Sequence, residues 1–506
     1  MSSWVRRVTL SVVAGSVLLV AAAGSSDEPA PFSRSRWIAE RSKTAKFSSE
    51  GVLPAEGPVP ASALEKPAVP PITAEARKGR KTWVRVSRDI LRPDGGTGQA
   101  ETQAEPFLAI DPENDLRLLA GYQEGRFAEG GARSLTWAFS KNGGRAWREG
   151  AVPGLTHASG GAFEKASDPW VAYGLDGRAY YASLLFNETS PENGIYVSTS
   201  EDGGRTWGPP VVVHNGDATH FEDKQSMIVD NYADSPFRGR IYVTWDTVSE
   251  TNQILRVARS EDGGQSFRPV VSVEGVGANF GALPLVGPGG VVHLFWMHAT
   301  AVANLAIYTS RSEDGGVTWS PKTVVAPVSR QGVENLRTGE LPSAAIDPRT
   351  GRIYVVWPDS FFTGGDIVGS DEIALVRSDD GGRTWTSRRK VSDDQSDASF
   401  TPAVAVDGHG RVAVSYYGHH YAKPYQVDHY VVISKDGESF GASRRSNGSS
   451  FDARFASVTD RGFFLGDYQG LVGGRNLFYA LWVGTLEPSL LHKGERQPDA
   501  FMSKIP

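Results

Sequence analysis

A short box that ends in an aromatic residue recurs six times along this chain of 506 residues. Its aspartate or asparagine stands at positions 142, 202, 262, 314, 380 and 436. The six copies read SKNGGRAW, SEDGGRTW, SEDGGQSF, SEDGGVTW, SDDGGRTW and SKDGESF. Self-similarity at a spacing of this size indicates a repeat protein in which each repeat is one supersecondary unit.

The residues of the box are those of a tight turn. An aspartate followed by glycine accepts backbone N–H groups across the turn, and glycine supplies a positive φ. The aromatic residue then covers the edge of the unit. We therefore expect a structural role for these aspartates and not a catalytic one.

Each box lies between two expected strands, for example 194–200 before it and 207–213 after it. Upstream lie an apolar inner strand and an aromatic-rich second strand such as 352–357. The box is then the hairpin between the third and fourth strands of a four-stranded unit. Inner strands are expected at 105–111, 168–174, 224–230, 281–287, 341–347, 401–407 and 462–468.

The ends of the chain account for a unit without a box. Residues 499–505 resemble a third strand, and Thr82-Trp83 resembles the end of a box. We expect a strand at 82–88 to complete the unit formed by 462–468, 476–483 and 499–505, which closes a ring and protects its edge. The prediction is an all-β fold over 81–506: a seven-bladed β-propeller of four-stranded antiparallel blades, closed by the N-terminal strand. A six-bladed propeller is the alternative.

Composition excludes several classes of function. The net charge is −6 and the basic residues are scattered, so no basic stripe is present for nucleic acid. The chain has no cysteine, which excludes disulfides, a thiol nucleophile and thiolate metal sites. No histidine spacing suggests a metal pair. We expect no cofactor and no metal.

The N-terminal residues predict export. Arg6 and Arg7 precede an apolar run from Val8 to Ala23, which predicts a signal peptide over 1–23; an uncleaved anchor is the alternative. Residues 24–80 are rich in Pro, Ala and Ser and predict a disordered linker. The mature protein is then expected to be secreted, periplasmic or at the cell surface, monomeric, and without a stable membrane span.

The series S-x-D-x-G-x-T-W across residues 80–506 resembles the Asp-box (BNR repeat) propellers, which include bacterial sialidases. For a sialidase the resemblance implies a Tyr nucleophile paired with a Glu, an Asp acid/base and three Arg that hold the substrate carboxylate. The chain departs from that family because it lacks an Arg-Ile-Pro signature; its nearest pairs are Arg92-Pro93 and Arg268-Pro269.

Strand order brings the polar residues at the starts of inner strands and the ends of second strands to the face opposite the boxes. Propellers usually bind ligands there. The resemblance then implies these roles: Tyr468 as nucleophile, Glu105 or Glu340 as its base, Asp168 as acid/base, and Arg126, Arg337 and Arg454 as carboxylate clamp.

Each of these side chains also has a structural interpretation. In that interpretation the acids accept N–H groups at strand starts, and the arginines form dispersed ion pairs. The prediction is a sialidase-like propeller that hydrolyses or binds an acidic glycan. The alternative is a non-catalytic propeller that binds a carbohydrate or a protein, as a scaffold or assembly factor.

Overall fold

The computed structural model describes residues 32–34, 36, 64, 83–91, 96, 98–249, 252–275, 277–299, 305–364, 371–393, 395–423, 425–487 and 496–506. The predicted signal peptide lies outside the described residues, as does most of the predicted linker. Within the linker, Arg34 is buried against the folded body: its backbone N donates to the carbonyl of Glu188 at 2.8 Å, and its guanidinium lies 4.9 Å from the centre of the Phe221 ring. No helix in the described part of the chain is long and apolar enough to cross a bilayer.

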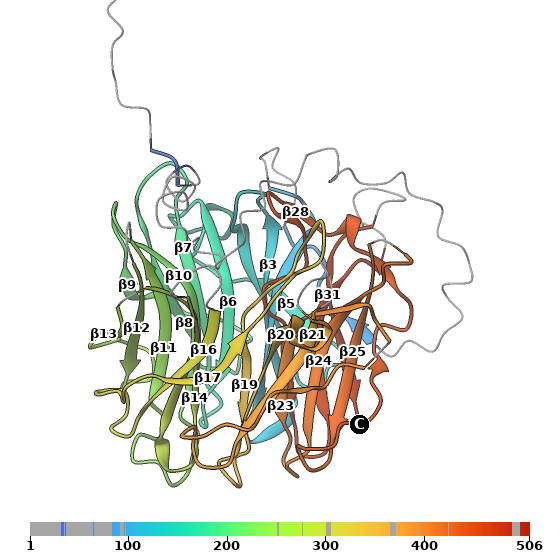
Figure 1. The fold of residues 1–506 in the computed structure, drawn as a ribbon. Helices are drawn as coiled ribbons and strands as arrows, with labels where there is room; N and C mark the ends of the chain where they lie inside the picture. Colours follow the sequence, from blue (N-terminus) through green and yellow to red (C-terminus); the bar gives the residue numbers. More distant parts are fainter. Residues whose placement is uncertain are drawn as a thin grey trace, which may run out of the picture.

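The described chain is built from antiparallel strands in successive four-stranded units, so the all-β prediction is confirmed (Figure 1). Six units contain a box. Their strands are β2 (Gln103–Asp111), β3 (Asn114–Arg126), β4 (Ala132–Ser140) and β5 (Arg148–Ala151); β6 (Lys165–Tyr173), β7 (Ala179–Phe186), β8 (Asn193–Ser200) and β9 (Val211–Asn215); β10 (Phe221–Val229), β11 (Ile241–Val248), β12 (Gln253–Ser260) and β13 (Val271–Glu274); β14 (Ala278–Val286), β15 (Val292–Ala299), β16 (Leu305–Ser312) and β17 (Thr323–Val328); β19 (Ser343–Ile346), β20 (Ile353–Asp359), β21 (Glu372–Ser378) and β22 (Arg389–Lys390); β23 (Ala398–Val406), β24 (Val412–His419), β25 (Gln426–Ser434) and β26 (Arg444–Arg445), with β27 (Phe451–Asp452) beside β25. Short 3-10 turns are η3 (His157–Ser159), η4 (Pro288–Gly290), η5 (Ser360–Thr363) and η6 (Ala453–Phe455).

The two ends of the chain form one further unit. Its strand order is β1 (Trp83–Arg85), β32 (Asp499–Ile505), β31 (Phe478–Gly484) and β30 (Gly470–Gly473). β1 pairs antiparallel with β32, with Trp83 opposite Ser503, which is the pairing expected for the N-terminal strand; Thr82 lies outside the described residues.

One predicted strand is wrong. Residues 462–468 do not form the inner strand of the last unit, because Gly466, at a φ of 144°, turns the chain there, and β30 begins only at Gly470. Residues Gly462–Phe464 instead form β29, which pairs with β28 (Ser457–Thr459) and with β18 (Leu336–Arg337). We call this three-stranded sheet the mouth sheet.

The units close on themselves. The innermost strands β2, β6, β10, β14, β19, β23 and β30 contact one another in chain order, and β30 contacts β2. Apolar clusters fill the spaces between neighbouring units. Trp245, Trp296, Trp357 and Trp482 are fully buried, so they pack in the core.

The boxes are turns, as predicted. In the box of β16, the Asp314 carboxylate accepts the backbone N–H groups of Val317 and Thr318 at 3.0 and 2.9 Å and the Thr318 hydroxyl at 2.6 Å. These hydrogen bonds stabilise the charged form and hold the pKa of Asp314 well below its usual value, although burial opposes them.

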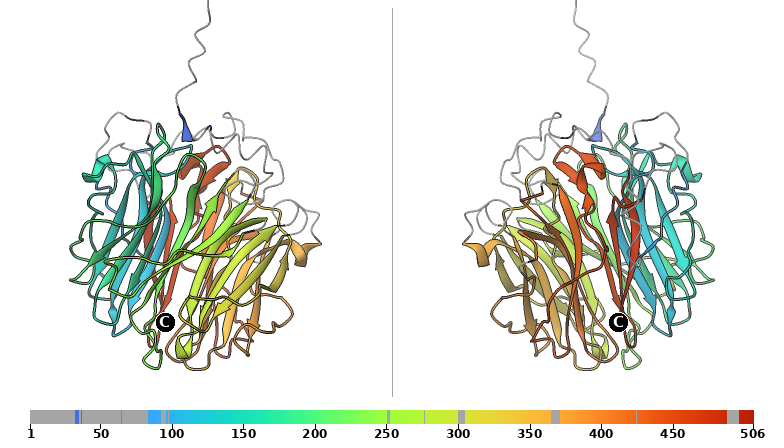
Figure 2. Two further views of the ribbon diagram at one scale, coloured as in Figure 1. Left: turned by 90° about the vertical axis from the view of Figure 1, so that its left-hand side faces the viewer. Right: turned by 90° about the vertical axis from the view of Figure 1, so that its right-hand side faces the viewer.

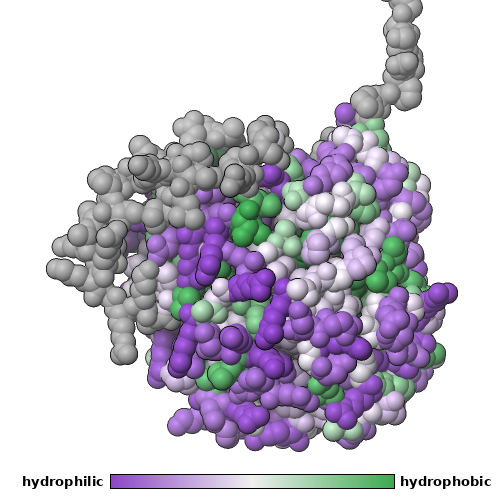
Figure 3. Space-filling view, turned by 180° about the vertical axis from the view of Figure 1, so that it is seen from behind, coloured by the Kyte–Doolittle hydropathy of each residue, from purple (hydrophilic) through white to green (hydrophobic). Residues whose placement is uncertain are grey.

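The strand directions define two faces. The inner and third strands run the same way, so the boxes and the ends of the inner strands share one face, the box face. The opposite face, where inner strands begin, is the mouth face. Figure 1 shows β28 of the mouth sheet at the top and the C-terminus near the bottom, and both views in Figure 2 agree. Seen from behind, the outer surface is mainly polar with scattered apolar side chains (Figure 3).

Candidate functional site

Three charged residues hold the same position in successive inner strands. Glu105, Asp168 and Lys224 each adopt a φ of 52°, in the left-handed region, at a β-bulge of β2, β6 and β10. A non-glycine residue rarely adopts this conformation, and it re-aims the side chain. The three side chains meet in the channel inside the ring.

Lys224 joins the carboxylates at the end of the channel that lies toward the mouth face. Its Nζ lies 2.6 Å from an Asp467 oxygen, 3.5 Å from Asp168 and 3.7 Å from Glu105. The Arg337 guanidinium donates to the same Asp467 oxygen at 2.7 Å. All five side chains are buried. We call Glu105, Asp168, Lys224, Arg337 and Asp467 the charge cluster.

The environment separates the protonation states of the acids. Burial, reinforced by the charge of Asp168, raises the pKa of Glu105 to about 8, and Lys224 only partly opposes this. Burial also acts on Asp467, but Arg337 and Lys224 outweigh it and hold the pKa of that carboxyl well below its usual value. Near neutral pH, Glu105 is therefore mainly protonated and Asp467 is ionised.

Two of the three predicted arginines meet at one cavity. The guanidiniums of Arg126 and Arg337 lie 4.6 and 4.2 Å from the centre of the Phe464 ring in the mouth sheet. Together with Glu105 and Asp168 they line a polar cavity of about 50 Å³. This volume is well below the range of about 300–1,000 Å³ that is usual for ligand pockets.

Arg454 does not join them, which corrects that part of the predicted clamp. Its guanidinium pairs with Asp452 at 2.6 Å and lies 5.2 Å from the centre of the Tyr425 ring. Both its backbone N and its side chain are bound by the Asp452 carboxylate at the turn that follows β27. This is the local ion pairing of the alternative interpretation.

Glu340 and Tyr468 lie near the cluster but are engaged elsewhere. Glu340 is buried and accepts a hydrogen bond from Arg330 at 3.1 Å. The Tyr468 hydroxyl donates to the carbonyl of Pro169 at 3.2 Å, and burial together with the charges of Glu105 and Asp168 raises its pKa well above 10. A tyrosine nucleophile donates its hydroxyl to an adjacent base, whereas the Tyr468 hydroxyl donates to a backbone carbonyl.

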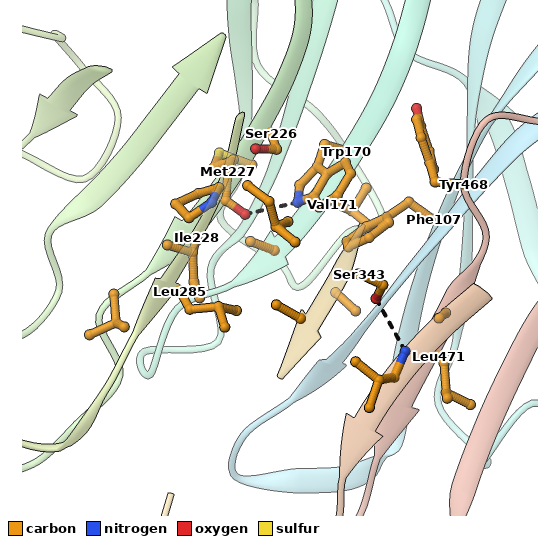
Figure 4. A pocket seen from close by; sticks show the side chains of 18 of the residues that line it. Phe107, Trp170, Val171, Ser226, Met227, Ile228, Leu285, Ser343, Tyr468 and Leu471 are labelled. Atoms are coloured by element: carbon orange, nitrogen blue, oxygen red, sulfur yellow. Dashed lines mark hydrogen bonds between the residues drawn. The ribbon is translucent and has the colours of Figure 1, made fainter. Parts of the chain in front are cut away.

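A larger cavity, which the sequence analysis missed, occupies the channel. It has a volume of about 700 Å³ and extends from Asp168 and Lys224 to residues that follow the inner strands, such as Pro112 and Tyr232. It therefore runs toward the box face. Its walls are mainly apolar, and Figure 4 shows Phe107, Trp170 and Tyr468 toward one end, with Ile228 and Leu285 facing Leu471 across it.

A sequence signal for both features exists in the repeat. When the inner strands are aligned, Glu105, Asp168 and Lys224 share one position, and Asp467 joins them only when the last inner strand is placed at β30 and not at 462–468. The apolar residues that follow at alternate positions then form the channel wall. Within the described residues, no group of three or more His, Asp or Glu side chains is placed to hold a metal ion.

Comparison with known proteins places these features in context. No family model matches the chain. A sialidase of Micromonospora viridifaciens is 27% identical over 254 residues, which are 47% of this chain and 32% of that sialidase. The chain has a sialidase-like Asp-box propeller fold. The matched region is thus about a third of the length of that sialidase.

Solved structures resemble the propeller only distantly. A Dyadobacter fermentans protein of unknown function has a TM-score of 0.43 at 15% identity, covering 84% of this chain and all of that one. A Trypanosoma rangeli sialidase in complex with sialic acid has a TM-score of 0.45 at 13% identity, covering 70% and 58%. An α-L-arabinofuranosidase of Fusarium graminearum has a TM-score of 0.42 at 12% identity, covering 67% and 93%. These likenesses are too distant to indicate an activity.

Proposed function

We propose that this chain is a seven-bladed propeller that binds its ligand without hydrolysing it. Support for seven blades comes from the six box-bearing units and the unit formed by the chain ends. The blades enclose a channel whose polar end is the charge cluster. The proposal also includes export through a signal peptide at 1–23 and a monomeric state.

The observation that carries this proposal is the pairing of the acids by Lys224. A glycosidase needs two carboxyl groups that reach the glycosidic oxygen and the anomeric carbon of a bound sugar. Here Glu105, Asp168 and Asp467 are directed at Lys224, at 3.7, 3.5 and 2.6 Å, and are 1%, 3% and 8% exposed. Groups held in this way serve stability and positioning.

Hydrolysis of an acidic glycan is the second candidate, and two observations favour it. Arg126 and Arg337 line the same cavity as Glu105 and Asp168, which is the chemistry of a carboxylate clamp beside a general acid. In addition, the separated pKa values of Glu105 and Asp467 are the pattern found in acid/base pairs.

Turnover assays separate the two candidates. The chain is incubated with fluorogenic sialosides, uronides and arabinofuranosides, and retention on immobilised glycans is measured in parallel. The binding proposal expects no release of fluorophore above that of the Asp168→Asn variant. Release by the wild-type chain that falls at least about 100-fold in Asp168→Asn, with the fold intact, overturns it and establishes the hydrolase.

A further inference from the structure

The channel cavity has a wall whose chemistry differs from that of a sugar site. Phe107 and Trp170 stack at 3.6 Å between ring centres, and Tyr468 packs edge-on against Trp170 at 5.4 Å. Aliphatic side chains such as Leu283 and Leu285 continue the wall on β14, where both are only partly buried. Apolar side chains that face an open cavity of this size mark a ligand site.

The hydrogen-bonding groups of the wall are largely occupied by the protein itself. The Trp170 indole N–H donates to the carbonyl of Met227 at 2.9 Å, as Figure 4 shows. The Ser343 hydroxyl accepts the backbone N–H of Val404 at 3.1 Å, and the Tyr468 hydroxyl donates to Pro169. A sugar in this channel loses the hydration of its hydroxyls and gains few partners in exchange, which is unfavourable.

The end of the cavity at the charge cluster disfavours a charged ligand. Lys224 reaches this end, but three acidic side chains already surround it, so a ligand carboxylate would bring a further negative group to an ammonium that is already paired. The Gln225 amide offers the ligand no new partner, because its carbonyl oxygen is buried out of reach of the cavity.

We propose that the channel is a binding site for a neutral, elongated apolar molecule that enters from the box face. This inference rests on the non-hydrolytic function proposed above and names its ligand class. The apolar body lies along Trp170, Leu283 and Leu285. The volume of about 700 Å³ lies within the usual range for small-molecule sites.

The test uses the neutral fluorescent probe N-phenyl-1-naphthylamine with the full chain. We expect saturable binding with a Kd on the order of 1 µM, and displacement of the probe by dodecanol at concentrations at least about tenfold lower than by dodecanoate. Sialic acid and arabinobiose are expected to leave the probe bound. Absence of saturable binding, or equal displacement by dodecanol and dodecanoate, overturns the inference.

Two variants locate the site and one controls for surface binding. Ala344→Phe fills the channel and is expected to raise the Kd of the probe at least about tenfold, and Leu285→Asn is expected to do the same if the first variant does not fold. Leu116→Asn changes an apolar residue of β3 that is 49% exposed and should leave the Kd within about twofold. An unchanged Kd in a folded channel variant refutes the location. Turnover in the glycoside assay would refute the proposed function alone, since probe binding is measured independently of it.

Discussion

Replacing Lys224 by methionine tests whether the charge cluster holds the inner strands together. The variant keeps an apolar side chain of similar length but leaves Asp168 and Asp467 buried without the ammonium that lies 3.5 and 2.6 Å away. Removal of one partner from a buried ion pair costs roughly 3–5 kcal/mol. Glu105 adds little near neutral pH, because its pKa of about 8 keeps it mainly protonated. We therefore expect a loss of about 3–5 kcal/mol at pH 7.

The assay is guanidinium unfolding followed by tryptophan fluorescence. Lys322→Met is the matched control, because Lys322 pairs with Glu274 at 2.8 Å at the surface, where the two side chains are 34% and 17% exposed. A pair of that kind contributes about 1 kcal/mol or less. Equal, small losses in both lysine variants would refute the structural role of the cluster.

Three further predictions concern the pH dependence of stability, the boxes and the pairing of β1 with β32. The pKa of Glu105 is about 8 in the folded chain and 4.5 in the unfolded chain, so between these pH values the folded chain keeps a proton that the unfolded chain releases, and stability falls as pH rises. Glu105→Gln should therefore be more stable than wild type at pH 8 but not at pH 4.5, as measured by unfolding at both pH values. Asp314→Ala should lower the free energy of unfolding by about 1–3 kcal/mol, because two turn amides lose their acceptor. Asp314→Asn, which copies Asn142 of the first box, should lower it less, and equal losses in the two variants would contradict this. Trp83 packs edge-on on Phe501 at 4.8 Å between ring centres, so Trp83→Ala should lower the free energy of unfolding by about 3 kcal/mol. An unchanged free energy of unfolding would show that the pairing of β1 with β32 adds no stability.

The fold follows from the sequence because its turns and strands are local. Each box supplies its own hydrogen bonds within a few residues, as Asp314 shows, so the motif predicts the hairpin without knowledge of the rest of the chain. The inner strands from 105–111 to 401–407 were predicted by the same local periodicity. The segment 462–468 failed because its apolar residues fit a strand, whereas Gly462 and Gly466 adopt positive φ values that local pattern does not reveal.

The candidate site was predicted only in part, because its contacts join residues far apart in the chain. Position in the repeat brought Glu105, Asp168 and Arg337 to one end of the channel, as expected. Lys224 shares a repeat position with Glu105 and Asp168, so its pairing with them could have been predicted, whereas the contact of Phe464 with Arg126 and Arg337 depends on how the mouth sheet forms. Arg454 was misplaced for the opposite reason: Asp452, only two residues earlier, binds it locally.

The pairing of β1 with β32 also bears on how this protein reaches its native state. During synthesis β1 emerges first and β32 last, so β1 remains an unpaired strand edge while all the box-bearing units can already form. Joining such distant segments is a long-range step, and long-range strand pairing slows folding. A chain interrupted before residue 499 would hold its boxes intact yet expose the edges of both β1 and β31, which are sites for pairing with other chains.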